Sequence, residues 1–363
     1  MNVIEVNDKL KSDEQCLAYL ESRRWPNGVR CVTCGSDKIS RITSSSKKQA
    51  IRKLYQCLES SCKQQFTATA GTLFHDSHLP LHKWFLAMAF MTQAKKGMSA
   101  KQLQTHLGLK SYQTAWYLCH RIRKAMAESG GAGLMGIVEV DETHVSGKYD
   151  KRRKREPRAT TIVAGMVERG GRVRTQKIPT ASKQVLVGMV KDNVQPTATV
   201  MTDELAAYKT LGGIVAKHDF VRHSAEEWVR GDVHTNTIEG CWSLLKRGIV
   251  GSFHKISVKH LDRYPAEFDF RFNNRKNREI FDDLVTRLVA RPAMPYRELT
   301  AQSAEPFSGP YKALLSRACS QIVALHGRGL DHAIQQRVEF VFLNFHRSRN
   351  LGSNSAIRAV VAT

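Results

Sequence analysis

Four short stretches between residues 134 and 202 carry the apolar patterning of β-strands. Residues 134–140 form a compact apolar run, and residues 160–168 and 172–178 lie on either side of a Gly-Gly pair that is typical of a β-hairpin turn. Residues 197–202 form a further apolar run of strand length. The pattern therefore predicts a sheet that contains one hairpin and at least two further strands.

Helical periodicity occurs between and after these strands. Ser182 precedes an apolar-periodic stretch and is a suitable N-cap. Residues 235–250 place their apolar side chains on one stripe, as in an amphipathic helix; these side chains are Ile238, Trp242, Leu245 and Ile249. The order strand, hairpin, helix, strand, short helix, strand, long helix predicts an α/β fold in which helices cover a mixed sheet.

A helix-turn-helix pattern precedes the strands. We expect a short helix from Ala100 to His106, a turn at Gly108, and a second helix that begins near Ser111 and runs to Lys124. The start of the second helix would enter a DNA groove, and basic side chains farther along would contact phosphates. The groove residues are Tyr112, Gln113 and Thr114, and the phosphate-contacting residues are His120, Arg121, Arg123 and Lys124. The alternative is a plain helical hairpin with no role in DNA binding.

The charge balance of the 363 residues points to a polyanionic partner. There are 56 Lys and Arg against 33 Asp and Glu, a net charge of +23, and basic side chains that neutralise phosphates release condensed counterions. No apolar run has the length of a membrane span, and the N-terminus lacks the pattern of a signal peptide. We therefore expect a cytoplasmic protein with no membrane partner, whose eight cysteines stay mostly reduced.

Two cysteine pairs have the spacing of a zinc ribbon. Cys31 and Cys34 are followed, after 22 intervening residues, by Cys57 and Cys62, and two such knuckles can surround one tetrahedral Zn²⁺ with four thiolates. Gly35 fits the tight turn of the first knuckle. The zinc would be structural, because protein sulfur fills all four positions. The alternative is four unrelated reduced thiols. Four further cysteines lie outside this pattern, and we expect them to be ordinary buried thiols: Cys16, Cys119, Cys241 and Cys319.

Three acidic residues stand where adjacent strands and a helix would bring them together. Asp141 ends the first strand, Asp203 ends a later strand after 61 intervening residues, and Glu239 follows on the long helix after 35 more. Carboxylate clusters bind Mg²⁺ or Mn²⁺, and two metals about 4 Å apart can hold the attacking and leaving oxygens of a phosphoryl transfer. Lys246 lies about two helical turns after Glu239 and would meet a DNA phosphate there. The spacing thus suggests a catalytic metal site.

Each of these acids also has a simpler interpretation. A single Asp or Glu is more often a cap or a surface charge than a ligand, and Glu239 with Lys246 can be a solvated pair on a helix face. Three neighbouring acids compete for the same roles, namely Glu139, Glu142 and Glu204. Glu139 shares a strand face with Asp141 and therefore merits a variant of its own.

Together the motifs resemble bacterial insertion-sequence transposases that have an N-terminal zinc ribbon and an RNase H-like (ISXO-type) DDE domain. The similar stretches are the cysteine pairs, FTATAGTLF at 66–74, VEVDETHVSGK at 138–148, TDELAAY at 202–208, residues 234–246, and GSFHKISVKHLDRYPAEFDFRFNNR at 251–275. The resemblance implies an RNase H-like sheet and metal-dependent cleavage and strand transfer. It also implies double-stranded DNA as partner (terminal inverted repeats and target DNA) and association with the nucleoid. Because transposition needs two DNA ends brought together, we expect a homo-oligomer in the DNA complex.

The resemblance implies Asp141 and Asp203 as the first two metal ligands and leaves the third position open between Glu239 and Asn236. We favour Glu239, because an anion binds Mg²⁺ better than a neutral amide and because Lys246 stands where a DDE helix has its basic residue. Asn236 would then be an auxiliary ligand or a helix N-cap.

We predict four regions and keep two rival functions open. The regions are a zinc ribbon at 12–75, a helix-turn-helix-like region at 76–132, the RNase H-like DDE domain at 133–298, and an extension of unknown role at 299–363. The basic run at 149–155 is either a DNA-backbone contact or a solvated stretch of charge. One rival function is a non-catalytic DNA-binding protein, either an inactive transposase remnant or a transcription regulator. The other is a structure-selective nuclease that cuts strands without joining them.

Overall fold

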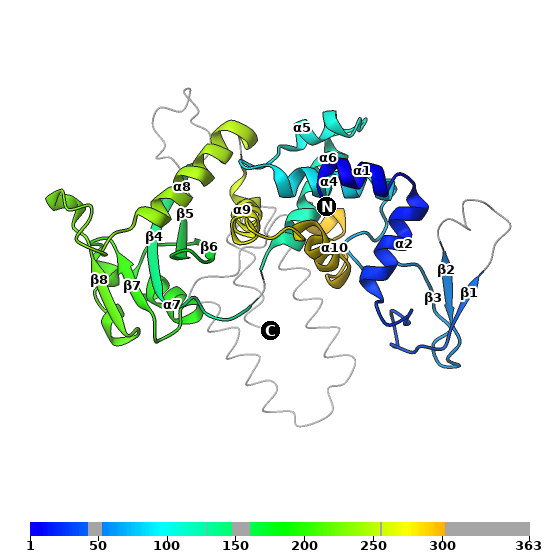
Figure 1. Ribbon diagram of the computed structural model, residues 1–363, viewed down its shortest axis with the longest axis horizontal. Helices are drawn as coiled ribbons and strands as arrows, with labels where there is room; N and C mark the ends of the chain where they lie inside the picture. Colours follow the sequence, from blue (N-terminus) through cyan, green and yellow to red (C-terminus); the bar gives the residue numbers. More distant parts are fainter. Residues whose placement is uncertain (43–52, 129, 147–159, 255, 302–363) are drawn as a thin grey trace, which may run out of the picture. The chain divides into compact units, whose positions relative to one another are not determined.

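The computed structural model (Figure 1) describes most of the chain up to residue 301. The described residues are 1–42, 53–128, 130–146, 160–254 and 256–301. The basic run at 149–155 and almost all of the predicted extension at 299–363 lie outside them. All structural statements below refer to the described residues.

The N-terminal region consists of two helices and a small antiparallel sheet. Helices α1 (Val3–Lys9) and α2 (Asp13–Arg24) each begin with a capping box. Strands β1 (Ile39–Ile42), β2 (Leu54–Cys57) and β3 (Gln65–Phe66) pair in the order β1-β2-β3. The apolar pattern of residues 12–75 does not predict α2, although Ser12 and Gln15 carry its capping signal.

The predicted pair of helices around Gly108 is confirmed. The helical region contains α4 (Leu81–Gln93), α5 (Ala100–His106) and α6 (Tyr112–Met126). Ser111 is the N-cap of α6, and its hydroxyl accepts a hydrogen bond from the Gln113 backbone N–H. Gly108 adopts φ +58° in the turn between the two helices, a conformation in which a side chain is strained.

The last described helices share an apolar core with this helical region. Helices α10 (Ile280–Ala290) and α11 (Tyr296–Thr300) bury their apolar residues with those of α2, α4 and α6. A buried ion pair of 2.6 Å joins Arg123 of α6 to Glu267 of α9 (Arg263–Asn273), which adds Phe270 to the same core. The chain therefore returns to the helical region after the large sheet, and residues 280–299 pack there.

A five-stranded mixed sheet forms the centre of the catalytic region that the sequence predicts. The strands are β4 (Ile137–Ser146), β5 (Thr160–Glu168), β6 (Val173–Ile178), β7 (Thr199–Thr202) and β8 (Lys217–Phe220). Their order is β6-β5-β4-β7-β8, antiparallel from β6 to β4 and parallel from β4 to β8. The predicted α/β fold class, a mixed sheet flanked by helices and preceded by a small cysteine-rich region, is confirmed.

Helices cover both faces of this sheet. Helix α7 (Lys183–Asn193) packs on one face, where Val138 and Val140 of β4 contribute to the core. Helices α8 (Asn236–Gly248) and α9 pack on the other face, and Figure 1 shows α8 lying across β4 and β5. Because alternate residues of a strand face opposite sides, Glu139 and Asp141 lie on the face that α8 covers. Short helical turns complete the region: Ala206–Tyr208, Leu211–Gly213, His223–Ala225, Ile249–Phe253 and Val258–His260.

The predicted order of elements is confirmed, but the first strand is longer than expected. It runs from Ile137 to Ser146, because β5 pairs with β4 along this whole length. Asp141 therefore lies in the middle of the strand rather than at its end. The parallel partner β7 pairs only with residues 137–139, so Asp141 still stands beside the point where β7 ends.

No helix among the residues that the structure describes is both long and apolar enough to span a lipid bilayer.

Candidate functional site

Four cysteine sulfurs converge at the small N-terminal sheet. The ligand atoms of Cys31, Cys34, Cys57 and Cys62 all lie within 4.8 Å of one another. The Sγ atoms of Cys31 and Cys62 are 3.7 Å apart, and those of Cys34 and Cys57 are 3.6 Å apart. Hydrogen bonds from neighbouring backbone N–H groups, foremost that of Cys34, lower the pKa of Cys31 to about 6. Burial, by contrast, raises the pKa of Cys57 to about 12. Four sulfurs at this spacing fit a structural zinc ion.

The local fold explains why these sulfurs meet. The first pair flanks a knuckle in which the Gly35 backbone N–H donates to the Cys31 carbonyl, with Gly35 at φ +75°. The second pair begins at the end of β2, which β1 joins as an antiparallel partner. An antiparallel pair of strands thus lies between the two cysteine pairs, and residues 43–52 lie outside the described part of the chain. The other described cysteines, Cys16, Cys119 and Cys241, are buried as expected.

The start of α6 is exposed, as a DNA-reading helix requires. Tyr112, Gln113 and Thr114 are all exposed. The expectation that basic residues farther along α6 contact phosphates is wrong for three of the four: His120, Arg121 and Arg123 are at most 3% exposed. The guanidinium of Arg121 lies over the rings of Trp84 and Tyr117 instead. The helix turns this side inward because it carries the apolar stripe that packs against α9 and α10.

Two strands bring Asp141 and Asp203 together. Asp203 directly follows β7, which pairs in parallel with β4 so that Met201 lies opposite Glu139. Two residues farther along both strands, Asp203 comes level with Asp141. The negative charge of Asp203 acts on Asp141 and on Glu142, whose carboxylate accepts a hydrogen bond of 2.7 Å from the Tyr208 hydroxyl.

Helix α8 contacts Asp141 through a tryptophan. The indole Nε1–H of Trp242 donates to Asp141 Oδ2 over 2.8 Å. The indole can lie this close because residue 165 of β5, the partner of Asp141 in the sheet, is glycine. A Cβ at Gly165 would stand 2.5 Å from a Trp242 ring atom. The small residue on β5 and the large one on α8 therefore set the distance between the helix and the sheet.

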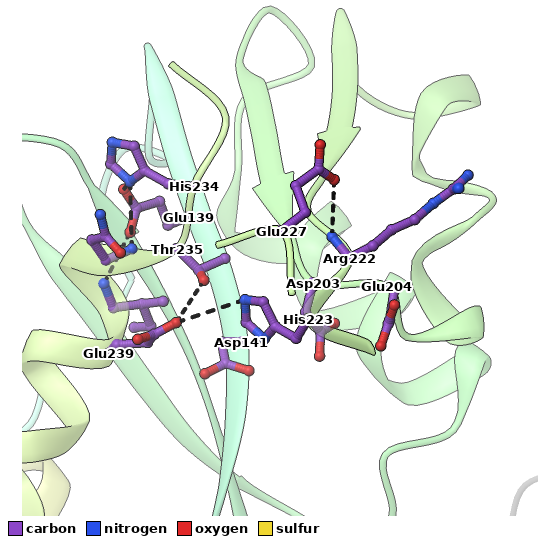
Figure 2. Close-up of polar contacts among 12 residues, drawn as sticks. Glu139, Asp141, Asp203, Glu204, Arg222, His223, Glu227, His234, Thr235 and Glu239 are labelled. Carbon is purple, nitrogen blue, oxygen red and sulfur yellow. Dashed lines mark hydrogen bonds and ion pairs between the residues drawn. The ribbon is translucent and has the colours of Figure 1, made fainter. Parts of the chain in front are cut away.

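Glu239 lies on the same face of the sheet as the two aspartates (Figure 2). Its Oε1 accepts a hydrogen bond of 2.9 Å from the Thr235 hydroxyl and lies 4.0 Å from His223 Nε2. Figure 2 shows the imidazole of His223 between Glu239 and Asp203. His223 Nε2 is buried and has no hydrogen-bond partner among the described residues. The ring packs against that of Trp228 at an interplanar angle of 31°, with 4.6 Å between centroids.

The electrostatics of this cluster suit a cation. Burial raises the pKa of Asp141 to about 7; the Trp242 hydrogen bond opposes this shift, and the charges of Glu142 and Asp203 add to it. Burial is also the main cause of the raised pKa of Glu142. Carboxylates that raise one another's pKa are stabilised as anions by a bound divalent ion. The donor set of oxygens is the one that Mg²⁺ and Mn²⁺ prefer.

The carboxylates are nevertheless more widely spaced than the cysteines. Within the described residues, the four cysteines are the one group of three or more potential ligands whose atoms all lie within 4.8 Å of one another. Such tight convergence is required around one ion, whereas in a two-metal site the outer ligands flank ions about 4 Å apart. Among the described residues, the three carboxylates therefore do not form a cluster as tight as that of the cysteines.

The two remaining predicted site residues are exposed on α8. Asn236 is the first residue of the helix, and the N-cap is Thr235. The alternative that Asn236 is the N-cap is therefore wrong, because the helix begins one residue earlier than that role needs. Lys246 is exposed near the C-terminal end of α8.

Three residues beside the carboxylates were not singled out as site residues from the sequence. In the sequence, Trp242 is one more apolar residue of the helical stripe, and Tyr208 is an aromatic residue without a recognisable motif role. His223 lies in a short loop segment without periodicity. The one available signal is glycine at position 165 within an otherwise apolar strand, which indicates close approach of another group.

Comparison with known proteins matches both the cysteine-rich region and the region of the large sheet to transposase domains. Residues 133–273 match the model of the ISXO2-like transposase domain, and residues 11–65 match that of the transposase zinc-ribbon domain. An uncharacterized protein in the transposable element ISH50 of Halobacterium salinarum is 29% identical over 291 residues, which are 74% of this chain and 92% of that relative. An uncharacterized transposase-like protein of Haemophilus influenzae is 27% identical over 103 residues, 28% of this chain and 82% of that relative.

Proposed function

The chain belongs to the ISXO2-like insertion-sequence transposases with a zinc ribbon, and from this premise we propose that it cleaves the ends of its element and transfers them to target DNA. The catalytic ligands in this proposal are Asp141, Asp203 and Glu239. The observation that carries it is their position on one face of the mixed sheet, on two adjacent parallel strands and the helix that covers them.

Divalent metal ions bound by the three carboxylates would activate the attacking oxygen and neutralise charge on the leaving oxygen of a phosphodiester. The chain's own residues prepare this site. Trp242 holds the carboxylate of Asp141 in one orientation through its hydrogen bond. Thr235 does the same for Glu239. Lys246, exposed on the same helix, is suited to hold a DNA phosphate beside the carboxylates.

DNA recognition in this proposal uses the exposed start of α6 and the zinc ribbon. Tyr112, Gln113 and Thr114 are exposed at the N-terminal end of the helix, the end that reads base edges in a major groove, although the Gln113 amide also donates to the Tyr296 hydroxyl over 2.6 Å. The net charge of +23 supplies the electrostatic part of the binding to terminal repeats and target DNA. Two ends must be held for transposition, so we expect a homo-oligomer in the DNA complex, acting in the cytoplasm at the nucleoid.

The decisive experiment compares three forms of the full chain on DNA that carries the ends of the element. Asp141→Asn should reduce Mg²⁺- or Mn²⁺-dependent cleavage by about 10³-fold, because metal-based charge stabilisation contributes several kcal/mol to the transition state. Binding to the same DNA should persist. The matched control is Asp192→Asn, which removes an exposed carboxylate at the end of α7, on the opposite face of the sheet, and should cleave like the unmodified protein.

The rival functions give different results in the same experiment. A non-catalytic DNA-binding protein would bind the ends and show no metal-dependent cleavage in any form. A nuclease would cleave but would not join a pre-cleaved 3′-hydroxyl end to a second duplex. The proposal requires both reactions to depend on Asp141.

A further inference from the structure

A second carboxylate of β4 lies buried beneath the start of α8. Glu139 is 0% exposed, and both of its oxygens accept hydrogen bonds from this helix. Oε2 accepts from the backbone N–H groups of Thr237 and Ile238 over 2.7 and 3.0 Å. Oε1 accepts from the Thr237 hydroxyl over 2.9 Å. The side chain thus joins the strand that carries Asp141 to the helix turn that precedes Glu239.

We propose that Glu139 is a positioning residue that locks α8 in register on β4 and so sets the place of Glu239 relative to Asp141. The inference rests on the proposed function, because it assigns Glu139 a role in that same site. Glu139 itself binds no metal in this proposal.

The first step of the argument concerns helix capping. The backbone N–H groups at the start of a helix lack partners within the helix, and the N-cap side chain normally accepts from the second or third of them. In α8 the N-cap is Thr235, whose hydroxyl donates to Glu239 instead. Glu139 accepts from the second and third residues, Thr237 and Ile238. A carboxylate from the sheet therefore caps the helix and leaves Thr235 free to orient Glu239.

The second step concerns register. Glu139 and Asp141 are two residues apart on one strand face, about 6.6 Å along the strand. Their partners on the helix, Ile238 and Trp242, are four residues apart, about 6 Å along the helix axis. Since these spacings match, one helix turn is attached to the strand at both of its ends. Glu239 lies within this doubly attached turn.

The third step concerns charge. A buried carboxylate is tolerated when it is paired, and Arg169 Nε donates to Glu139 Oε1 over 2.7 Å. The same guanidinium donates to the carbonyl of His234 over 3.1 Å, and His234 Nδ1 lies 3.3 Å from Glu139 Oε1. The network leaves neither oxygen of Glu139 free for a metal. It also holds the chain that enters α8 against the β5–β6 hairpin.

The test uses Glu139→Gln, which keeps the shape and removes the charge. The matched control is Asp269→Asn. Asp269 is also buried, and its carboxylate accepts from the Thr175 backbone N–H over 2.8 Å and from the Thr175 hydroxyl, but it joins α9 to β6. Each variant loses a buried, hydrogen-bonded carboxylate. Glu139 forms its hydrogen bonds with α8, whereas Asp269 forms its hydrogen bonds with β6.

The readout is Mn²⁺ titration of the ¹⁵N-labelled full chain, followed through the Trp242 indole resonance. That N–H group bonds to Asp141, so Mn²⁺ held there broadens its signal. We expect Glu139→Gln to raise the Mn²⁺ concentration at the titration midpoint by about tenfold or more, the usual effect of losing an outer partner of a metal site. Asp269→Asn should leave the midpoint unchanged. Amide hydrogen exchange at Thr237 and Ile238 should accelerate only in Glu139→Gln.

Equal Mn²⁺ midpoints and equal exchange rates in the two variants would overturn the proposal and reduce Glu139 to a structural carboxylate. If Glu139→Gln does not fold, Thr237→Val tests the same proposal, because it removes only the hydroxyl that donates to Glu139. We expect a smaller shift of the midpoint in that variant. If the unmodified protein shows neither Mn²⁺ broadening nor cleavage, the proposed function fails, and the exchange rates still decide whether Glu139 holds α8.

Discussion

The cysteine cluster and the carboxylate cluster are both sets of metal-ligand side chains, but the fold assembles them in different ways. The cysteines come from two knuckles within 32 residues of one another, and one hairpin closes the set. The carboxylates come from three elements spread over 99 residues, and the core of a mixed sheet brings them together. Carboxylates that lie this far apart in the chain also repel one another where they meet.

The difference shows in what surrounds each ligand. The four sulfurs lie against one another. Each carboxylate has a partner of its own instead: the Trp242 indole for Asp141, the Leu205 backbone N–H for Asp203, and the Thr235 hydroxyl for Glu239. A local site therefore needs correct spacing, whereas a distributed site also needs neighbouring donors that hold each ligand at its distance. The following predictions test this contrast.

The largest expected effect is at the zinc ribbon. Cys57→Ser should abolish stoichiometric zinc binding and unfold the β1–β3 sheet, because structural zinc contributes about 10 kcal/mol or more to such small folds. The large sheet should stay folded, since its core contains no residue of the ribbon. Zinc content per chain and limited proteolysis measure both effects. Cys241→Ser, at a buried thiol of α8, should retain zinc; loss of zinc there would contradict the assignment.

A smaller effect is expected when Trp242, the hydrogen-bond partner of Asp141, is replaced. Trp242→Phe keeps an aromatic ring over Gly165 and removes the indole donor. We expect metal-dependent cleavage to fall by about 10-fold to 100-fold, as for other outer partners of metal ligands.

The control for this change is Trp84→Phe. Trp84 is buried in the helical region, and its Nε1–H donates to the Ser77 hydroxyl over 2.9 Å. That variant loses a comparable hydrogen bond and should cleave normally. Equal losses in the two variants would mean that any buried indole hydrogen bond matters, and would remove Trp242 from the site.

The smallest effect concerns a buried ligand-type side chain that belongs to neither site. His120 is 0% exposed, and neither ring nitrogen has a hydrogen-bond partner among the described residues. Burial, with the nearby charges of Arg123 and Arg263, lowers the pKa of His120 to about 2. The folded pKa is below the unfolded value, so the stabilisation is complete above about pH 6.5 and is lost as the pH falls toward 2.

The expected slope is at most about 1.4 kcal/mol per pH unit below pH 6.5. His120→Phe should flatten the fall in melting temperature between pH 6.5 and 5, whereas His78→Phe, at an exposed position, should not. An unchanged slope in His120→Phe would show that other groups govern the acid response.

Local sequence patterns were sufficient to predict much of the fold. The turn at Gly108, the cap at Ser111 and the hairpin formed by β5 and β6 depend on neighbouring residues, and each is present as the sequence indicates. The spacing of the cysteines likewise identified the cluster that the structure contains. The predicted end of the first strand was wrong, because pairing with β5 extends β4 to Ser146. The residues of β4 alone do not reveal how far a partner strand pairs with them.

The sequence by itself determined which elements form and which side chains have the chemistry to bind metal, because capping, turn formation and periodicity act over a few residues. Only the tertiary structure decided which way those side chains face. It turned His120, Arg121 and Arg123 inward, and it placed Glu139 under the start of α8. Burial and cross-element hydrogen bonds depend on residues that are distant in the chain, so their outcome is settled when helix and sheet pack together.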